Sequence, residues 1–151
     1  MTERIEMHPE HLRRLGEAAG APEPELVLPE QPEGQRSQSG NPLVACLADA
    51  LRFYMEFHRL YDQGYVAHVH DAFAACAAAG RTSFATRLAT VDVETDSPLL
   101  MGTTVADFRG LWGLAPNARI VSDNNPGHCF DELITSVGAL AHAVGPRSPT
   151  G

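Results

Sequence analysis

Five polar side chains near the middle of the sequence have residue types and spacing that could support chemistry. They are His58, Asp62, His68, His70 and Asp71. Asp62 follows His58 by four residues and Asp71 follows His68 by three, so each pair would share one face of a helix. Imidazole nitrogens together with a carboxylate can bind Zn²⁺ or another transition metal and leave one position open for water. The sequence therefore predicts a metal site here, with a transition metal as its cofactor.

A structural role for the same histidines is the alternative. His58 falls on an apolar helical stripe, which is typical of a hydrogen-bonded core histidine. If residues 66–79 form a helix, His70 is rotated by about 200° from His68. No His-x-x-x-His or Glu-x-x-His spacing reinforces the metal interpretation.

Cys129 is a candidate reactive thiol. It lies near the start of a predicted helix, where the helix dipole lowers the pKa of a thiol. His128 precedes it directly, but neighbouring residues on a helix point about 100° apart and do not form a Cys–His pair. The alternative is a capping turn followed by a buried thiol. No catalytic residue is assigned.

The sequence lacks the residues and motifs that several kinds of chemistry require. It has no lysine, which excludes Schiff-base and phosphate-lysine mechanisms. It also lacks a Gly-x-Gly-x-x-Gly loop, a Gly-x-Ser-x-Gly elbow and an EF-hand loop. The absence of these motifs excludes nucleotide-binding proteins with a glycine-rich loop, hydrolases with a nucleophile elbow, and EF-hand calcium-binding proteins.

The elements that would position the polar residues begin at Asn41-Pro42, a capping side chain followed by proline at the first helical position. A helical apolar stripe follows, made up of Leu43, Leu47, Leu51, Tyr54, Met55 and His58. Turn residues at 62–64 interrupt it, and a second stripe runs from Val66 to a stop at Gly80. The pattern predicts an antiparallel helical hairpin over 42–79.

Other segments have weaker patterns. A short helix is expected over 8–19, and a longer one after Asn125-Pro126 that ends at Gly145-Pro146. Residues 84–95 suit either a strand or a helix, 105–112 suit a short helix, and 119–122 suit a short strand. The expected fold class is mainly α: the hairpin and C-terminal helix packed as a small bundle, with one or two short strands. The alternative is α+β, with a strand–helix–strand–helix second half.

The expected domain organisation has three parts. Residues 1–40 are a proline- and glutamate-rich arm or linker, 41–145 a single globular domain, and 146–151 a disordered tail. The arm has one apolar triplet, 26–28, which is either a docking segment or incidental.

Charge and composition limit the kinds of partner that we expect this protein to bind. Nineteen acidic and eleven basic residues give a net charge of −8, which repels phosphate backbones and disfavours nucleic-acid binding. No 18-residue apolar run is present, so no membrane partner is expected. Three scattered cysteines and a polar N-terminus favour a reduced, cytoplasmic protein.

These observations lead to two functional hypotheses. The first is a small acidic helical protein that acts by protein–protein interaction, as an adaptor, accessory subunit or oligomeric scaffold. A protein partner or self-association is then expected. The second is a metal-binding protein or small metal-dependent enzyme that uses the His/Asp site at the hairpin turn.

Overall fold

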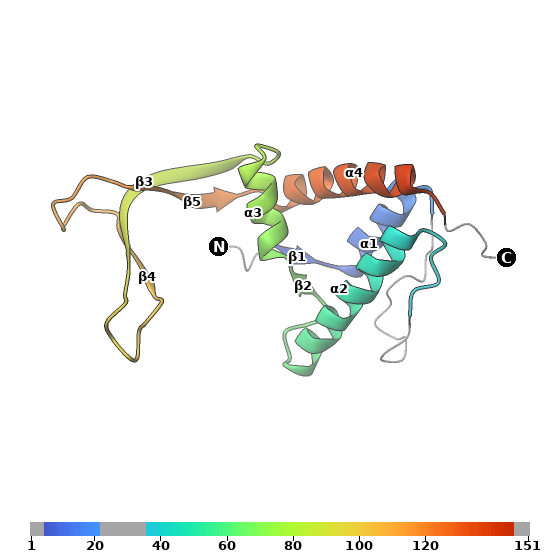
Figure 1. Ribbon diagram of the computed structural model, residues 1–151, viewed down its shortest axis with the longest axis horizontal. Coiled ribbons are helices and arrows are strands. Elements are labelled where there is room, and N and C mark those ends of the chain that lie inside the picture. The colour runs from blue at the N-terminus through green and yellow to red at the C-terminus, as the bar shows by residue number, and fades with distance from the viewer. Residues whose placement is uncertain (1–4, 22–35, 147–151) are drawn as a thin grey trace. The chain divides into compact units, whose positions relative to one another are not determined.

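The computed structural model describes residues 5–21 and 36–146. Contacts within the chain divide these residues into two compact units, one over 84–124 and one made of the remaining residues on either side. The larger unit holds α1 (Pro9–Ala18), α2 (Pro42–Leu60), α3 (His70–Ala78) and α4 (Pro126–Val144). It also holds β1 (Glu6–Met7) and β2 (Ala67–His68), which form a two-stranded antiparallel sheet (Figure 1).

The two long helices begin where the Asn-Pro pairs predict. The Asn41 side chain accepts hydrogen bonds from the backbone N–H groups of Leu43 and Val44, and the Asn125 side chain accepts one from His128. Proline follows each cap, where its missing donor costs no helical hydrogen bond. α4 ends before Gly145, whose φ of 70° is in the region that glycine adopts readily.

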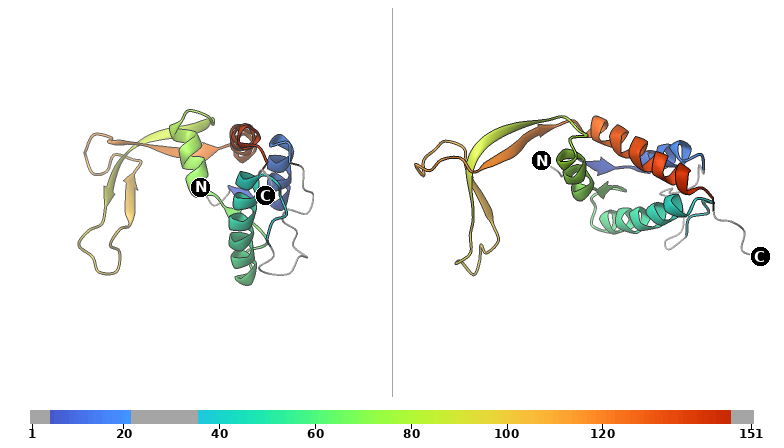
Figure 2. Two further views of the ribbon diagram at one scale, coloured as in Figure 1. Left: turned by 45° about the vertical axis from the view of Figure 1, so that its right-hand side comes forward. Right: turned by 45° about the horizontal axis from the view of Figure 1, so that its top comes forward.

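The core of the larger unit lies between α1, α2 and α4, which contact one another in pairs (Figure 2). Its largest fully buried side chains are Ile5, Leu12, Met55, Val44 and Cys129. At Gly138 the α1 backbone comes so close to α4 that an added Cβ would lie 2.5 Å from the Cβ of Ala18. Glycine at this position therefore permits the contact between the two helices.

The predicted helical hairpin is only partly right. α2 ends at Leu60, and Asp62 and Gly64 make the expected turn with φ values of 57° and 84°. The chain then enters β2 instead of a helix, because Ala67 and His68 pair with β1. α3 begins only at His70 and packs against α4, while α2 contacts β2 and α4.

The smaller unit is a three-stranded antiparallel sheet. β3 (Phe84–Val93) is central, with β4 (Thr104–Asp107) and β5 (Ala118–Asn124) on its two sides. Residues 84–95, which suited either a strand or a helix, contain β3, and the short strand expected over 119–122 is present within β5. β-branched and aromatic side chains along β3 favour this conformation over the helical alternative.

The short helix expected over 105–112 is wrong. Residues 104–107 are β4, and the chain turns directly afterwards. The Asp107 carboxylate accepts hydrogen bonds from the backbone N–H groups of Arg109, at 2.9 Å, and Trp112, at 2.7 Å. These bonds hold a turn that competes with a helix, and Gly110 and Gly113 have φ values of 71° and 67°.

The expected fold class, mainly α and packed as a small bundle, is therefore wrong. Five strands in two sheets accompany the four helices over the described residues, which fits the α+β alternative. From residue 84 onward the chain forms three strands followed by a helix, in place of the strand–helix–strand–helix order of that alternative. The domain boundaries predicted after residues 40 and 145 stay predictions. The apolar triplet 26–28 and most of the predicted disordered tail, 146–151, lie outside the described residues.

No helix among the described residues is long and apolar enough to cross a membrane.

Candidate functional site

The three histidines of the predicted site lie in one row. The ring centroids of His58 and His68 are 4.8 Å apart, and those of His68 and His70 are 5.8 Å apart. The first pair meets edge to face, whereas the second is stacked with only 4° between the ring planes. The structure thus brings together three side chains from α2, β2 and the start of α3.

His58 forms the buried end of this row. Its ring is 5% exposed, and Nδ1 lies 2.9 Å from the backbone carbonyl oxygen of Tyr54, one helical turn earlier. A carbonyl only accepts hydrogen bonds, so Nδ1 carries the proton in this contact. The Nε2 atom of neutral His58 is then left as an acceptor. The role of core histidine that the sequence suggested is compatible with this hydrogen bond.

His68 and His70 stack because the backbone between them is not helical. His68 ends β2, where side chains two residues apart point to the same side. The rotation of about 200° expected between them applies only inside a helix. The expected rotation would have placed the two rings on different faces, because it assumed a helix from Val66 onward.

Two buried nitrogen atoms in the row have no hydrogen-bond partner. The Nδ1 atoms of His68 and His70 are both inaccessible to solvent, and neither has a partner among the described residues. Buried polar atoms are nearly always hydrogen-bonded, so such atoms often mark functional positions. An imidazole whose nitrogen is not committed to a neighbour can exchange a proton with a ligand near neutral pH.

The two aspartates are placed differently. Asp62 is exposed at the turn after α2, and Asp71 is exposed in the first turn of α3. Over the residues that the structure describes, no group of three or more His, Cys, Asp or Glu side chains is arranged to hold a metal ion. The three imidazoles meet through their rings, and the metal site stays a prediction.

The environment of Cys129 matches the alternative, a buried thiol after a capping turn, and not a reactive thiolate. Cys129 is 1% exposed in the first turns of α4, and burial, together with the neighbouring Cys76 thiol, raises its pKa to about 11. The stabilising effect of the helix N-terminus on a thiolate is therefore outweighed by desolvation. His128 is exposed beside it.

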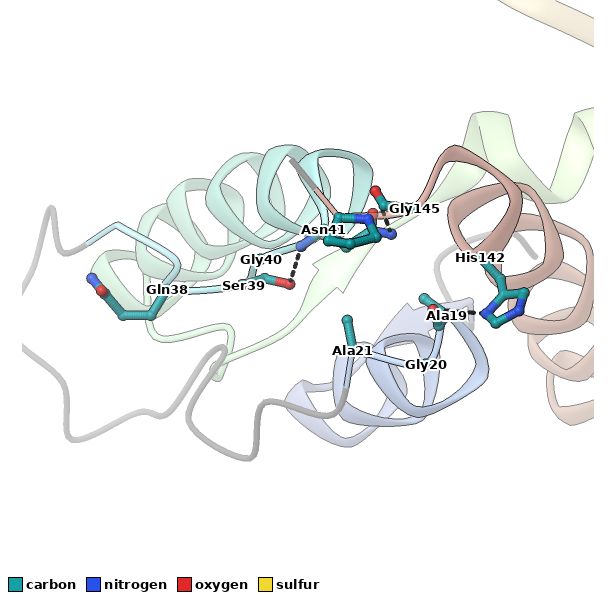
Figure 3. A pocket seen from close by; sticks show the side chains of 10 residues that line it. Ala19, Gly20, Ala21, Gln38, Ser39, Gly40, Asn41, His142 and Gly145 are labelled. Atoms are coloured by element: carbon teal, nitrogen blue, oxygen red, sulfur yellow. Dashed lines mark hydrogen bonds between the residues drawn. The ribbon is translucent and has the colours of Figure 1, made fainter. Parts of the chain in front are cut away.

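A pocket that the sequence did not indicate lies at the other end of α2. It has a volume of about 410 Å³ and is formed by the end of α1, the segment before α2 and the end of α4 (Figure 3). His142 stands at its wall, with Nδ1 3.3 Å from the carbonyl oxygen of Ala19. Along α2, roughly 25 Å of helix separate this pocket from His58. Its walls come from three segments that are far apart in the sequence, so no local sequence motif indicates the pocket.

Comparison with known proteins identifies the family. The family model of the inosine-uridine preferring nucleoside hydrolases matches residues 1–131. The chain therefore belongs to the nucleoside hydrolase family.

Individual relatives are similar over a shorter stretch. Pyrimidine-specific ribonucleoside hydrolases RihA of Salmonella schwarzengrund, Salmonella typhimurium and Salmonella enteritidis are 35% identical to it over 85 residues. These residues are 56% of this chain and 27% of each relative. The chain thus matches about a quarter of the length of these curated relatives.

Family membership corrects the first functional hypothesis. An adaptor, accessory subunit or scaffold that acts by protein–protein interaction is wrong for this chain, because the family is one of enzymes that hydrolyse nucleosides. Sequence reasoning missed this because it found no complete catalytic motif.

Proposed function

We propose that this chain takes part in hydrolysis of the N-glycosidic bond of ribonucleosides, with pyrimidine ribonucleosides as its first substrates to test. Family membership supports the reaction class, and the names of the Salmonella relatives support the substrate class. The observation that carries the proposal in the structure is the row of three imidazoles, His58, His68 and His70.

The reaction needs a proton donor. The bond between ribose C1′ and the base nitrogen breaks, a water oxygen bonds to C1′, and the base leaves with a proton. Imidazole is the side chain whose ordinary pKa suits such a transfer at neutral pH. His70 is the terminal member of the row, and its buried Nδ1 has no partner among the described residues, so we assign it the role of proton donor.

The test is a hydrolysis assay on the full chain with cytidine, uridine and inosine, following release of ribose as reducing sugar and of the free base by chromatography. His70→Ala should lower kcat by roughly 10² to 10⁴-fold, the usual contribution of a general acid. His128→Ala is the matched control, because His128 is an exposed histidine outside the row. An inactive full chain, or a His70→Ala variant as active as the control, would refute the proposal.

The transition-metal site at His58, His68, His70, Asp62 and Asp71 is kept as a separate proposal. The unpartnered Nδ1 atom of His68 supports it, since a ligand nitrogen must offer its lone pair. Metal analysis of protein purified without an affinity tag tests it. A metal content well below one ion per chain, unchanged in His70→Ala, would end it. A cytoplasmic location is likewise a proposal.

A further inference from the structure

The orientation of the His70 ring depends on a neighbouring ring. His70 is the first residue of α3, and its buried Nδ1 has no hydrogen-bond partner among the described residues. A functional histidine is commonly oriented by a hydrogen bond to one of its ring nitrogens, and Nδ1 of His70 lacks such a bond. The ring of His68 lies beside it instead, with 4° between the planes and 5.8 Å between the centroids. A ring face therefore takes the place of the missing hydrogen bond.

His68 is itself fixed by contacts that are distant in the sequence. It lies opposite Glu6 in the pairing of β1 with β2, and the backbone N–H of the next residue, Val69, donates to the carbonyl oxygen of Ile5 at 3.1 Å. Ile5 is completely buried, which ties this pairing to the core. The His58 ring meets the His68 ring edge to face at 4.8 Å. Strand pairing thus holds the His68 backbone, and His58 packs against its ring.

We propose that His68 is a positioning residue for His70: its ring face holds the His70 ring in one rotamer, and its nitrogen atoms are not needed for this role. The inference rests on the proposed role of His70 as proton donor. Offset parallel rings attract one another at centroid distances of about 4.5–7 Å, the range in which this pair falls. Without the stack, the His70 side chain would have other staggered rotamers open to it.

The stacking role differs chemically from metal binding by the same residue. A metal ligand must offer a nitrogen lone pair, whereas a stacking partner needs only a flat aromatic face. Phenylalanine keeps such a face and has no nitrogen, while alanine removes both. His68→Phe and His68→Ala therefore separate the two roles of His68, because only the stacking role survives in His68→Phe.

The first experiment measures kcat and KM of these two variants in the hydrolysis assay on the full chain. His68→Ala should lower kcat about 2- to 12-fold, as expected for loss of one aromatic pair, and leave KM unchanged, because proton transfer is affected and not substrate binding. His68→Phe should recover most of the wild-type kcat. His128→Ala, which removes an exposed histidine outside the row, is the matched control. Equal losses in His68→Ala and His68→Phe, or no loss in His68→Ala, would overturn the inference.

Nuclear magnetic resonance of the histidine-labelled full chain tests the same inference without activity. In the wild type and in His68→Phe, the couplings about χ1 of His70 should be those of one rotamer, with Overhauser effects between its ring and the ring at position 68. In His68→Ala the couplings should be averaged over several rotamers. Circular dichroism checks that each variant is folded.

Averaged couplings of His70 in the wild-type chain, or a single rotamer in folded His68→Ala, would overturn the inference. An inactive wild-type chain would refute the proposed hydrolysis instead. The couplings would then still decide whether His68 holds the His70 ring, so the two failures are distinguishable.

Discussion

At the scale of single residues, Asn41 shows how one side chain can connect two helices. Its Oδ1 caps α2, and its Nδ2 donates to the carbonyl oxygen of Ala141 in α4 at 2.7 Å. The side chain is 2% exposed, so water does not compete for these bonds. The cap that the sequence predicted is therefore also a tertiary contact between segments 100 positions apart.

Asn41→Ala should lower the free energy of unfolding by about 2 kcal/mol, through loss of the cap and of one buried hydrogen bond. Asn125→Ala removes the corresponding cap of α4, which is exposed and makes one backbone contact, so we expect a loss of about 1 kcal/mol. Urea unfolding of both variants measures the difference. Equal losses would show that the bond to Ala141 adds nothing.

His11 should make stability depend on pH. Its ring stacks on Phe130 with centroids 4.1 Å apart, and Nδ1 accepts a hydrogen bond from the backbone N–H of His8. Burial is the main cause that lowers its pKa below 6.5, followed by the charges of His8 and Arg14. The charge of Glu10 acts in the opposite direction and raises the pKa.

Because the folded state lowers the pKa of His11, the unfolded chain takes up the proton first as the pH falls. The His11 contribution is complete above about pH 6.5 and is lost below it. We therefore expect His11→Gln to flatten the fall in unfolding free energy between about pH 7.5 and about pH 5. His128→Gln, which replaces an exposed histidine, should keep the wild-type slope. An unchanged slope in His11→Gln would refute the assignment.

The residue types of the candidate site could be predicted from the sequence, but their geometry could not. The sequence grouped His58 and His68 in one candidate site, and their rings are 4.8 Å apart. The stacking of His68 on His70 depends on the pairing of β2 with β1, which is more than 60 positions away. Local periodicity has no information on such long-range pairing.

At the scale of the elements, the α1–α4 contact depends on a residue without a side chain. Gly138 is buried in the middle of α4, and a Cβ there would meet Ala18 at 2.5 Å, well inside normal contact. Gly127 lies in the first turn of the same helix, where a Cβ would meet only the Asn125 side chain, at 3.5 Å. Both glycines therefore lie in the same helix, but only Gly138 is packed closely against another helix.

Substituting these glycines should give effects of opposite sign. Gly138→Ala should destabilise the protein by about 1–3 kcal/mol, because α1 and α4 must move apart. Gly127→Ala should stabilise it by up to about 1 kcal/mol, because alanine loses less conformational entropy in a helix. Thermal unfolding of the two variants beside the wild type measures both effects. A neutral Gly138→Ala would mean that the helices do not pack as described.

The sequence predicted the helices better than the strands for a physical reason. Asn-Pro caps and Gly stops are local, and they placed the start of α2 and both ends of α4. β3 lacks such start and stop signals; its β-branched residues favour a strand, and its pairing with β4 and β5 fixes that conformation. The turn after Asp107 was taken as a helix because its apolar spacing is helical, while the bonds from Asp107 to the backbone oppose a helix.

At the scale of the whole molecule, apolar burial is distributed unevenly between the two units. Of the fully buried hydrophobic residues among those described, Ala89 alone belongs to the unit over 84–124. The same unit has many large exposed side chains, among them Leu88, Leu99 and Leu111 at 59%, 90% and 70% exposure. Its stability therefore rests mainly on backbone hydrogen bonds and side chain–backbone contacts.

Such a distribution predicts two levels of protection in native-state hydrogen exchange. Amides of β3, β4 and β5 should open with a free energy at least about 2 kcal/mol below that of α1 and α4. The reason is that burial of apolar surface contributes about 25 cal/mol per Å², and little apolar surface is buried in the 84–124 unit.

Within that unit, the Val91 amide should be the best protected, because the Asn117 side chain accepts its hydrogen at 2.8 Å and donates back to its carbonyl at 2.9 Å. Asn117→Ala should remove that local excess and leave α1 and α4 unchanged. Equal protection of strands and helices would instead mean that the two units unfold as one.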